Sequence, residues 1–432
     1  MRKVYVWMFS GFLAVMHPFG SVSYAGKTEV ISVDSAGKLG NGMSNDPSIS
    51  AAGRYVAFES TASNLVPGDT NGYADIFVHD RKTGETKIIS KDSSGKPANG
   101  PSEHSRISAD GRYVAFKSTA SNLVPGDTNG ASDIFVHDRV TGKTIIISMD
   151  SSGKSANGRS SNPAISADGR YVAFDSTAGN LVPSATNGKS HIFVHDRKTG
   201  KTKIISTDSA GNIGNNNGNR PSISADGRYV AFESTASNLV PVETNGKTHI
   251  FVHDRSTGKT KTISMDSSGK LGNNDSNRPS ISADGRYVAF DSDASNLVTG
   301  DTNEAPNVFV HDCVTAETKI IDKDFAGKVG NNRGSSDAAI SSDGRYVVYE
   351  SQADNLVPGD TNGKSDAFIH DRQTGETKII SVNSKGTQGN AGGCFASAIS
   401  ADGRYVAFSS EASNLVPDDM NGERDIFVHD CR

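Results

Sequence analysis

The sequence predicts an all-β fold, a propeller of seven blades with four antiparallel strands in each blade. The first observation is a repeat, because the phrase ISADGRYVAF recurs with few changes every 58 or 59 residues. The second is that each repeat holds four short segments rich in β-branched and aromatic residues, separated by turn residues, and no helical periodicity. Such a repeat is typical of one propeller blade. The seven copies of the phrase begin near residues 49, 107, 165, 223, 281, 340 and 399.

The second repeat shows how the strands are assigned. Residues 106–108 are expected to form a short first strand, and residues 112–118 a second strand whose consecutive apolar residues indicate burial on both faces. Residues 133–138 and 143–148 are the third and fourth strands, joined by a hairpin turn that contains glycine. The connections alternate between tight turns and long loops. We therefore expect the tight turns on one face of the ring and the long loops on the other.

The two ends of the repeat array predict how the ring closes. Residues 28–33 match the fourth strand of a repeat, whereas the last repeat stops after its third strand. The N-terminal strand is therefore expected to complete the last blade, which leaves no open sheet edge at the junction.

The first 25 residues have the pattern of a secretory signal peptide. Arg2 and Lys3 precede an apolar run over residues 4–16, and small residues at 23 and 25 suit a cleavage site. The run is shorter than the roughly 20 residues of a membrane-spanning helix, which favours a cleaved signal over a retained anchor. We therefore expect a propeller over residues 26–432 in a periplasmic or secreted protein, with no membrane span after cleavage.

The net charge of the chain bears on its partners, and its cysteine content bears on disulfide bonds. The net charge is −5 with both signs mixed along the chain, so we expect no nucleic-acid or membrane-surface partner and a monomeric protein. Three cysteines do not form a disulfide framework, and Cys313 and Cys431 occupy equivalent places two repeats apart. Free thiols are predicted.

The repeat resembles a known family. The phrase I-S-x-D-G-R-Y-V-A-F, followed by D-I-F-V-H-D-R-x-T-G-x-T-x-x-I-S, is similar to the TolB-type, WD-like β-propeller repeat over residues 28–430. The resemblance implies a β-propeller. The chain is expected to depart from TolB itself, which carries an additional α/β domain ahead of its propeller, because the seven repeats account for residues 26–432. The resemblance does not imply one function, because propellers of this kind serve in envelope complexes, peptidases and lyases.

Positions that are identical in every repeat are interpreted as structural, since a catalytic group is needed only once. The histidine of the VHD phrase is expected to make a hydrogen bond near the third-strand hairpin. The aspartates of VHD and ADG are expected to accept backbone N–H groups of their turns. The histidines are His79, His137, His195, His253, His311, His370 and His429.

The loop phrase GDTNGxxD precedes the third strand in four repeats and has two interpretations. Oxygen ligands at positions one, three and seven around a glycine resemble the first half of a Ca²⁺ loop. The same residues also suit an Asx turn that shapes the loop without metal. Apart from this Ca²⁺ hypothesis no cofactor is expected. The residues are Asp69, Asn71, Asp75, Asp127, Asn129, Asp133, Asp360, Asn362, Asp366, Asp419, Asn421 and Asp425.

One position varies where its neighbours are copied. It lies three residues before the repeated isoleucine, at the entry to the first strand, which faces the channel of a propeller. Arg220 and Arg278 fall side by side, opposite acidic residues, so the channel mouth could hold an anionic group or a partner's side chain. The alternative is that these loop ends vary without constraint. The predicted ligand-binding residues are Asp46, His104, Asn162, Arg220, Arg278 and Asp337.

The sequence therefore favours a non-catalytic binding or scaffold platform for protein or glycan. It contains no G-x-S-x-G or H-E-x-x-H motif, and no catalytic residues are assigned. One alternative is a polysaccharide-directed lyase or hydrolase with its active site at the channel mouth. The other is a Ca²⁺-stabilised structural surface protein.

Overall fold

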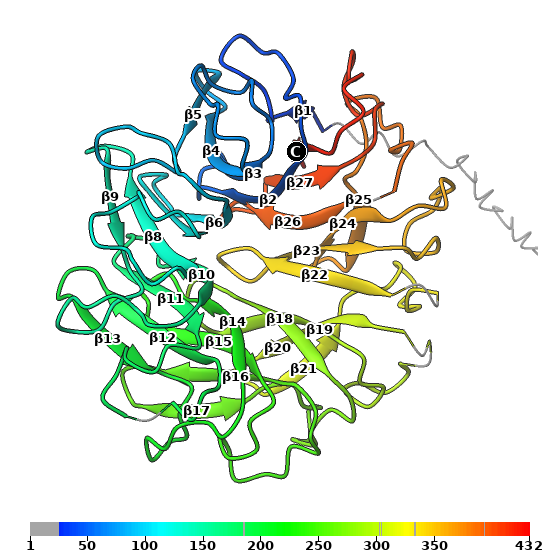
Figure 1. The fold of residues 1–432 in the computed structure, drawn as a ribbon. Helices are drawn as coiled ribbons and strands as arrows, with labels where there is room; N and C mark the ends of the chain where they lie inside the picture. Colours follow the sequence, from blue (N-terminus) through cyan, green and yellow to red (C-terminus); the bar gives the residue numbers. More distant parts are fainter. Residues whose placement is uncertain (1–25, 185, 302, 304, 332–333, 393) are drawn as a thin grey trace, which may run out of the picture.

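The computed structural model describes residues 26–184, 186–301, 303, 305–331, 334–392 and 394–432. These residues form seven four-stranded antiparallel sheets arranged in a ring around a central opening (Figure 1). The predicted all-β, seven-bladed propeller is confirmed. The predicted signal peptide, residues 1–25, lies outside the described residues.

The strands of each blade are ordered from the channel outward. The innermost are β2 (Ser44–Ile49), β6 (Ser102–Ile107), β10 (Ser160–Ile165), β14 (Gly218–Ile223), β18 (Ser276–Ile281), β22 (Ser335–Ile340) and β26 (Phe395–Ile399). The second are β3 (Tyr55–Ser60), β7 (Tyr113–Ser118), β11 (Tyr171–Ser176), β15 (Tyr229–Ser234), β19 (Tyr287–Ser292), β23 (Tyr346–Ser351) and β27 (Tyr405–Ser410). The third are β4 (Asp75–Asp80), β8 (Asp133–Asp138), β12 (His191–Asp196), β16 (His249–Asp254), β20 (Asn307–Asp312), β24 (Asp366–Asp371) and β28 (Asp425–Asp430). The outermost are β5 (Glu85–Ile88), β9 (Lys143–Ile146), β13 (Lys201–Ile204), β17 (Lys259–Thr262), β21 (Glu317–Ile320), β25 (Glu376–Ile379) and β1 (Thr28–Val30).

The predicted strand boundaries in the second repeat hold for its third strand and need correction at its first. β8 spans the expected residues 133–138, whereas β6 is six residues long and begins four residues before its predicted start. The pairing of β6 with β7 shifts register between Glu103 and Arg106. This bulge interrupts the alternation of polar and apolar residues, so the first residues of β6 were not recognised as part of a strand.

The ring closes as predicted. β1 pairs antiparallel with β28, with Thr28 opposite His429 and Val30 opposite Phe427. In Figure 1 this N-terminal strand, coloured blue, lies beside the red C-terminal strands. The seventh blade thus contains both ends of the repeat array, in the order β26, β27, β28, β1.

The core is built between blades as well as within them. Val114, Ala115 and Phe116 of the second strand are fully buried, which confirms that both faces of this strand are covered. One hydrophobic cluster joins Phe58 of blade 1 to Ile426 of blade 7, so side chains of neighbouring blades share each core. Burial of this kind stabilises a ring through every one of its interfaces.

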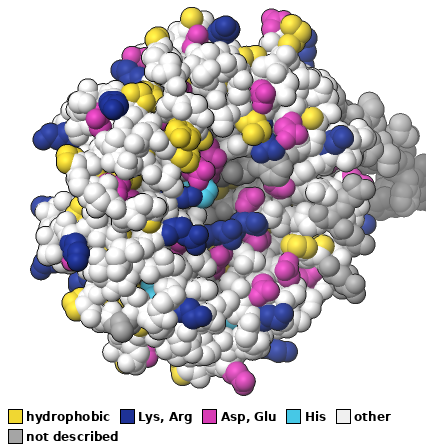
Figure 2. All heavy atoms as spheres, viewed as in Figure 1, with side chains coloured by type: hydrophobic (Ala, Val, Ile, Leu, Met, Phe, Trp, Pro, Cys, Tyr) yellow, Lys and Arg dark blue, Asp and Glu magenta, His cyan; other side chains and the backbone are white. Residues whose placement is uncertain are grey.

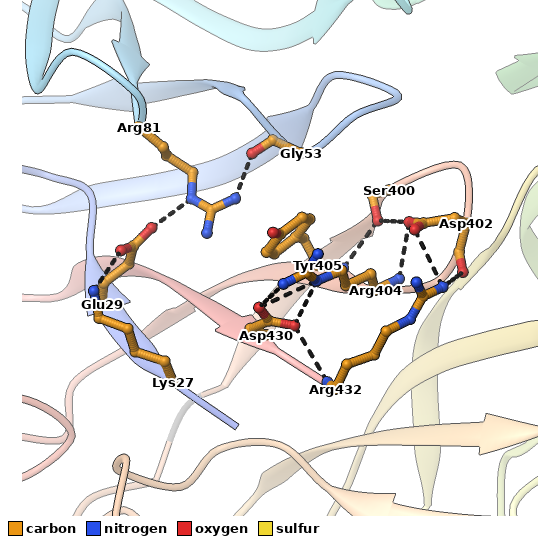
Figure 3. A network of polar contacts seen from close by, with 10 residues as sticks. All are labelled: Lys27, Glu29, Gly53, Arg81, Ser400, Asp402, Arg404, Tyr405, Asp430 and Arg432. Carbon is orange, nitrogen blue, oxygen red and sulfur yellow. Dashed lines mark hydrogen bonds and ion pairs between the residues drawn. The ribbon is translucent and has the colours of Figure 1, made fainter. Parts of the chain in front are cut away.

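A repeated contact on the tight-turn face joins neighbouring blades at five of the seven interfaces, and Figure 3 shows one of them. Arg81 of blade 1 lies over the ring of Tyr405 in blade 7, 4.2 Å from its centroid, and donates to the carbonyl of Gly53. Gly53 has φ of +72°, and a Cβ there would lie 2.1 Å from the tyrosine ring. Arg404 stacks on the same ring and pairs with Asp430. The equivalent arginine–tyrosine pairs are Arg139–Tyr55, Arg197–Tyr113, Arg255–Tyr171 and Arg372–Tyr287.

The residues that every repeat shares have the structural roles expected of them. His79 Nδ1 lies 2.9 Å from Thr86 Oγ1, across the third-strand hairpin. Asp80 accepts the backbone N–H of Lys82 and a two-point ion pair from Arg54. These groups belong to the frame and are not free for chemistry.

Cys313, Cys394 and Cys431 are free thiols, as predicted for the first and last of them. Among the described residues, no helix is long and apolar enough to cross a membrane.

Candidate functional site

The central channel contains a cavity of about 620 Å³, lined mainly by the innermost strands of the seven blades. Its walls are polar and charged. In Figure 2 the surface is hollowed at the centre of the ring, and basic, acidic and histidine side chains gather around the hollow. The six residues predicted to bind ligand all line this one cavity: Asp46, His104, Asn162, Arg220, Arg278 and Asp337.

A β-bulge brings each of these side chains to the channel. In blade 3, two residues of β10 lie opposite one residue of β11 between Ser161 and Ala164, and Asn162 is one of the two. A bulge bends the strand and redirects its side chains. The six residues also share a left-handed backbone, with φ between +45° and +54°. This conformation costs a residue with a Cβ roughly 1 kcal/mol, so the surrounding fold holds the backbone of these six residues in a strained conformation.

The sequence interpretation missed five carboxylates behind this position. They lie on the second strands, directly after the repeated phenylalanine or tyrosine and directly before the repeated serine. Three of them accept a hydrogen bond from the backbone N–H of the left-handed residue in the next blade. Glu59 accepts from His104 at 3.0 Å, and Glu233 accepts from Arg278 at 3.0 Å. The signal was present, because this position also varies among the copies. Its residues are Glu59, Lys117, Asp175, Glu233, Asp291, Glu350 and Ser409.

The arginines of the channel are already paired with carboxylates. Arg220 Nη1 lies 3.3 Å from Glu233 Oε1. Arg278 Nε lies 3.1 Å from Asp337 Oδ1, and its Nη1 lies 3.5 Å from Asp291 Oδ2. Glu233 joins the two arginines, since it also accepts the backbone N–H of Arg278. The two arginines do lie together, but their charges are balanced within the wall and do not form an open anion site.

The third arginine of the cavity is paired in the same way. Arg106 Nη1 lies 3.0 Å from Asp46 Oδ2. Burial lowers the pKa of His104, so this histidine is neutral at pH 7.

Several channel carboxylates are poorly compensated. Burial raises the pKa of Glu59, Asp291 and Glu350 to about 7 in each case, and neighbouring carboxylates add to the shift. The channel wall therefore holds more carboxylates than its positively charged side chains compensate.

The GDTNGxxD loops lie apart from this cavity, before the third strands. In blade 1, Asn71 Oδ1 accepts the backbone N–H of Tyr73 at 2.9 Å, and its Nδ2 donates to Asp75 Oδ2 at 2.5 Å. Ser90 donates to the other oxygen of Asp75 at 2.5 Å. These bonds form an Asx turn that ties the loop to the end of the fourth strand. The same Asn–Asp bond joins Asn129 to Asp133 and Asn421 to Asp425.

The blades that lack the full phrase replace its bonds. His191 stands in place of the second aspartate, and its Nδ1 lies 3.1 Å from Ser206 Oγ. His249 makes the equivalent contact with Ser264 at 3.0 Å. Among the described residues, no group of three or more His, Cys, Asp or Glu side chains is placed to hold a metal ion. The geometry favours the turn interpretation over the Ca²⁺ hypothesis.

The chain matches no protein-family model, and no curated protein matches its sequence. Its fold is similar to that of many solved structures. An oligogalacturonate lyase in complex with manganese aligns at a TM-score of 0.56, with 11% identity, over 94% of this chain and 97% of that chain. The β-propeller domain of the Trilobed protease from Pyrococcus furiosus aligns at 0.54, with 16% identity, over 90% and 93%.

TolB from Acinetobacter baumannii aligns at a TM-score of 0.41, with 16% identity, over 88% of this chain and 81% of that chain. This similarity to TolB is distant. At such identities these likenesses concern the fold alone.

Proposed function

We propose that this chain is a non-catalytic binding propeller that holds a partner at the mouth of its central channel. The observation that carries the proposal is the convergence of variable positions. Seven blades share an almost identical frame, yet the position three residues before the repeated isoleucine differs in charge and size, and its residues in six blades line one cavity. Since the frame folds with any of these residues, their differences serve something other than folding.

The frame makes the channel suitable for binding. Arginine–tyrosine contacts join the blades at five interfaces, bulges fix the left-handed residues, and backbone hydrogen bonds to carboxylates hold three of these residues. Side chains that are ordered before a partner arrives lose little entropy on binding. The long loops around the mouth add a wider surface for a protein or a glycan.

The sequence supports a proposal for the compartment and the class of partner. The pattern of residues 1–25 supports export, so we propose that the protein acts as a monomer in the periplasm or outside the cell. The mixed charge of the chain supports a partner other than nucleic acid.

A lyase or hydrolase at the channel mouth receives less support. The similarity to an oligogalacturonate lyase concerns the fold. Along the described part of the channel wall, His104 is the only histidine that lines the cavity.

A screen of ligands against the channel tests the proposal. The parent protein is presented to a random peptide library and to neutral, acidic and amino oligosaccharides, and the best ligands are measured by biolayer interferometry. They are then measured on a channel variant, Asp46→Asn with Arg220→Gln, and on a control, Lys143→Gln with Lys201→Gln, whose residues lie on outer strands.

We expect the channel variant to bind at least tenfold more weakly and the control to bind within twofold of the parent. Melting curves confirm that all three proteins are folded. Equal binding by the channel variant, or no ligand above background, would contradict the proposal.

A further inference from the structure

The channel wall between blades 5 and 6 has three carboxylates around one guanidinium. Arg278 contacts Asp337 at 3.1 Å and Asp291 at 3.5 Å. Asp337 is a charged neighbour of both Asp291 and Glu350 and raises the pKa of each. Arg278 acts on all three carboxylates, with weaker contributions from Arg220 at Asp291 and from Arg424 at Glu350.

Two oxygen atoms of this group lack a hydrogen-bond donor. Asp291 is 5% exposed, and its Oδ1 has no partner among the described residues. The Oε2 of Glu350 is also buried and has no partner within the part of the chain that the structure describes, while its Oε1 accepts from Ser365 at 3.2 Å. A buried carboxylate oxygen without a donor is costly, because it has lost its water and gained nothing in return.

The same position is satisfied in other blades. Glu59, Asp175 and Glu233 each accept the backbone N–H of the next blade's left-handed residue. The deficit at Asp291 and Glu350 is thus a local feature of blades 5 and 6 and not a general property of the repeat.

A group that supplies positive charge and N–H donors would satisfy this wall. An ammonium has three donors and a guanidinium five. Of this group Arg278 and Asp337 line the cavity, together with apolar atoms of Pro279, Ala338 and Ile340, whereas Asp291 and Glu350 stand on the second strands behind it. An alkyl stem can lie along such atoms while its charged head reaches the carboxylates.

We infer that this part of the channel receives the side chain of a lysine or arginine from a partner protein. The inference rests on the proposed function and adds the chemistry of the partner. The arginine charges of the channel are balanced by carboxylates, so a second anion would meet an acidic wall, whereas a cation completes it.

Short fluorescent peptide amides test the inference. Tetralysine, tetraglutamine and tetraglutamate are titrated with the full chain at about 0.15 M salt, where the attraction of distant surface charges is screened. The variant Asp291→Asn with Glu350→Gln removes two charges from the channel. The control Glu317→Gln with Glu376→Gln removes two exposed charges from the outer strands of the same blades.

We expect tetralysine to bind at least tenfold more tightly than tetraglutamine, the channel variant to lose at least tenfold, and the control to stay within twofold. Equal binding of tetralysine and tetraglutamine, or an unchanged affinity in the channel variant, would overturn the inference. Spermidine that binds as tightly as tetralysine would overturn the assignment to a protein side chain. Channel-dependent binding of tetraglutamate would refute this inference and leave the proposed function intact.

Discussion

The tight-turn face and the channel mouth of this ring are built from the same repeat but differ in how much their residues vary from blade to blade. On the tight-turn face, Asp80 and Arg54 form a two-point ion pair, and Arg81 is held by a tyrosine ring and a backbone carbonyl. At the channel, left-handed residues carry strain, and Asp291 leaves a buried oxygen without a donor. The copied region therefore stabilises the fold, although Arg139, Arg197 and Arg372 there each have a buried Nε without a partner among the described residues. The varied region gives each blade a different charge at the channel.

Removal of the closing strand is expected to have the largest effect, because it breaks the frame itself. Deletion of residues 26–34 removes β1 and the buried side chains of Ile31 and Val33, and leaves β28 as an open edge. We expect aggregation or a loss of roughly 5 kcal/mol in the free energy of unfolding, measured by urea denaturation. A deletion variant that melts like the parent would show that the ring does not depend on this strand.

A methyl group at Gly53 tests the lock between blades. Gly53→Ala places a Cβ against the ring of Tyr405, in addition to the strain of positive φ, so we expect a loss of roughly 3 kcal/mol. Gly84→Ala is the matched control, because Gly84 has φ of +75° and open space around it, and should lose only about 1 kcal/mol. Equal losses in the two variants, measured by thermal and urea unfolding, would remove the tyrosine contact from the explanation.

The channel carboxylates predict a stability that falls as pH rises. Burial, with Asp337 nearby, raises the pKa of Glu350 to about 7 from an ordinary 4.5, while Arg278 and Arg424 oppose the shift. The native state then holds a proton that the unfolded chain has released. The contribution of this proton to the free energy of unfolding is complete below about pH 4.5 and is lost as pH rises through 7. Glu350→Gln should therefore stabilise the protein by on the order of 2 kcal/mol at pH 8 and have little effect at pH 4.

The frame supplies the contrasting case. The ion pair with Arg54 lowers the pKa of Asp80 to about 2, so this contribution is present above about pH 4 and is lost as pH falls toward 2. Asp80→Asn should destabilise the protein at pH 8 and lose that effect at pH 2. Parallel pH profiles for the Glu350 and Asp80 variants would contradict the distinction between frame and channel.

Relief of backbone strain at the channel should produce a small gain. His104 has φ of +54° and keeps its backbone bond to Glu59 whatever its side chain. His104→Gly is expected to raise the free energy of unfolding by about 0.5 kcal/mol. The loss of backbone strain stabilises the folded protein, and the greater conformational entropy of glycine in the unfolded chain offsets part of this gain. A clear destabilisation in urea would mean that the His104 side chain contributes to folding.

Metal ions are expected to change stability least. Because Asn71, Asn129 and Asn421 turn their amide nitrogens toward the loop aspartates, we expect the same melting midpoint in EDTA, Mg²⁺ and Ca²⁺. A ligand that binds only the native state must raise the midpoint. A rise specific to Ca²⁺ that disappears in Asp69→Asn with Asp127→Asn would restore the calcium hypothesis.

Much of the fold could be predicted from the sequence because the repeat period defines the blades and their number. Seven copies define seven blades, and the match of residues 28–33 to a fourth strand predicts the closure. The six channel residues were found by their variation. The bulge at His104 was not predicted, because it interrupts the polar–apolar alternation by which strands are recognised. The carboxylates at Glu59 and Glu233 were missed because their role depends on the next blade, which local sequence does not reveal.

Hydrogen–deuterium exchange with a bound ligand tests the central claim most directly. Exchange is measured on the parent protein with and without the tightest peptide from the library. We expect added protection in the innermost strands β2, β14, β18 and β22 and in the long loops around them, with the tight turns and outer strands unchanged. Protection confined to the tight-turn face or to the outer strands would contradict a binding site at the channel.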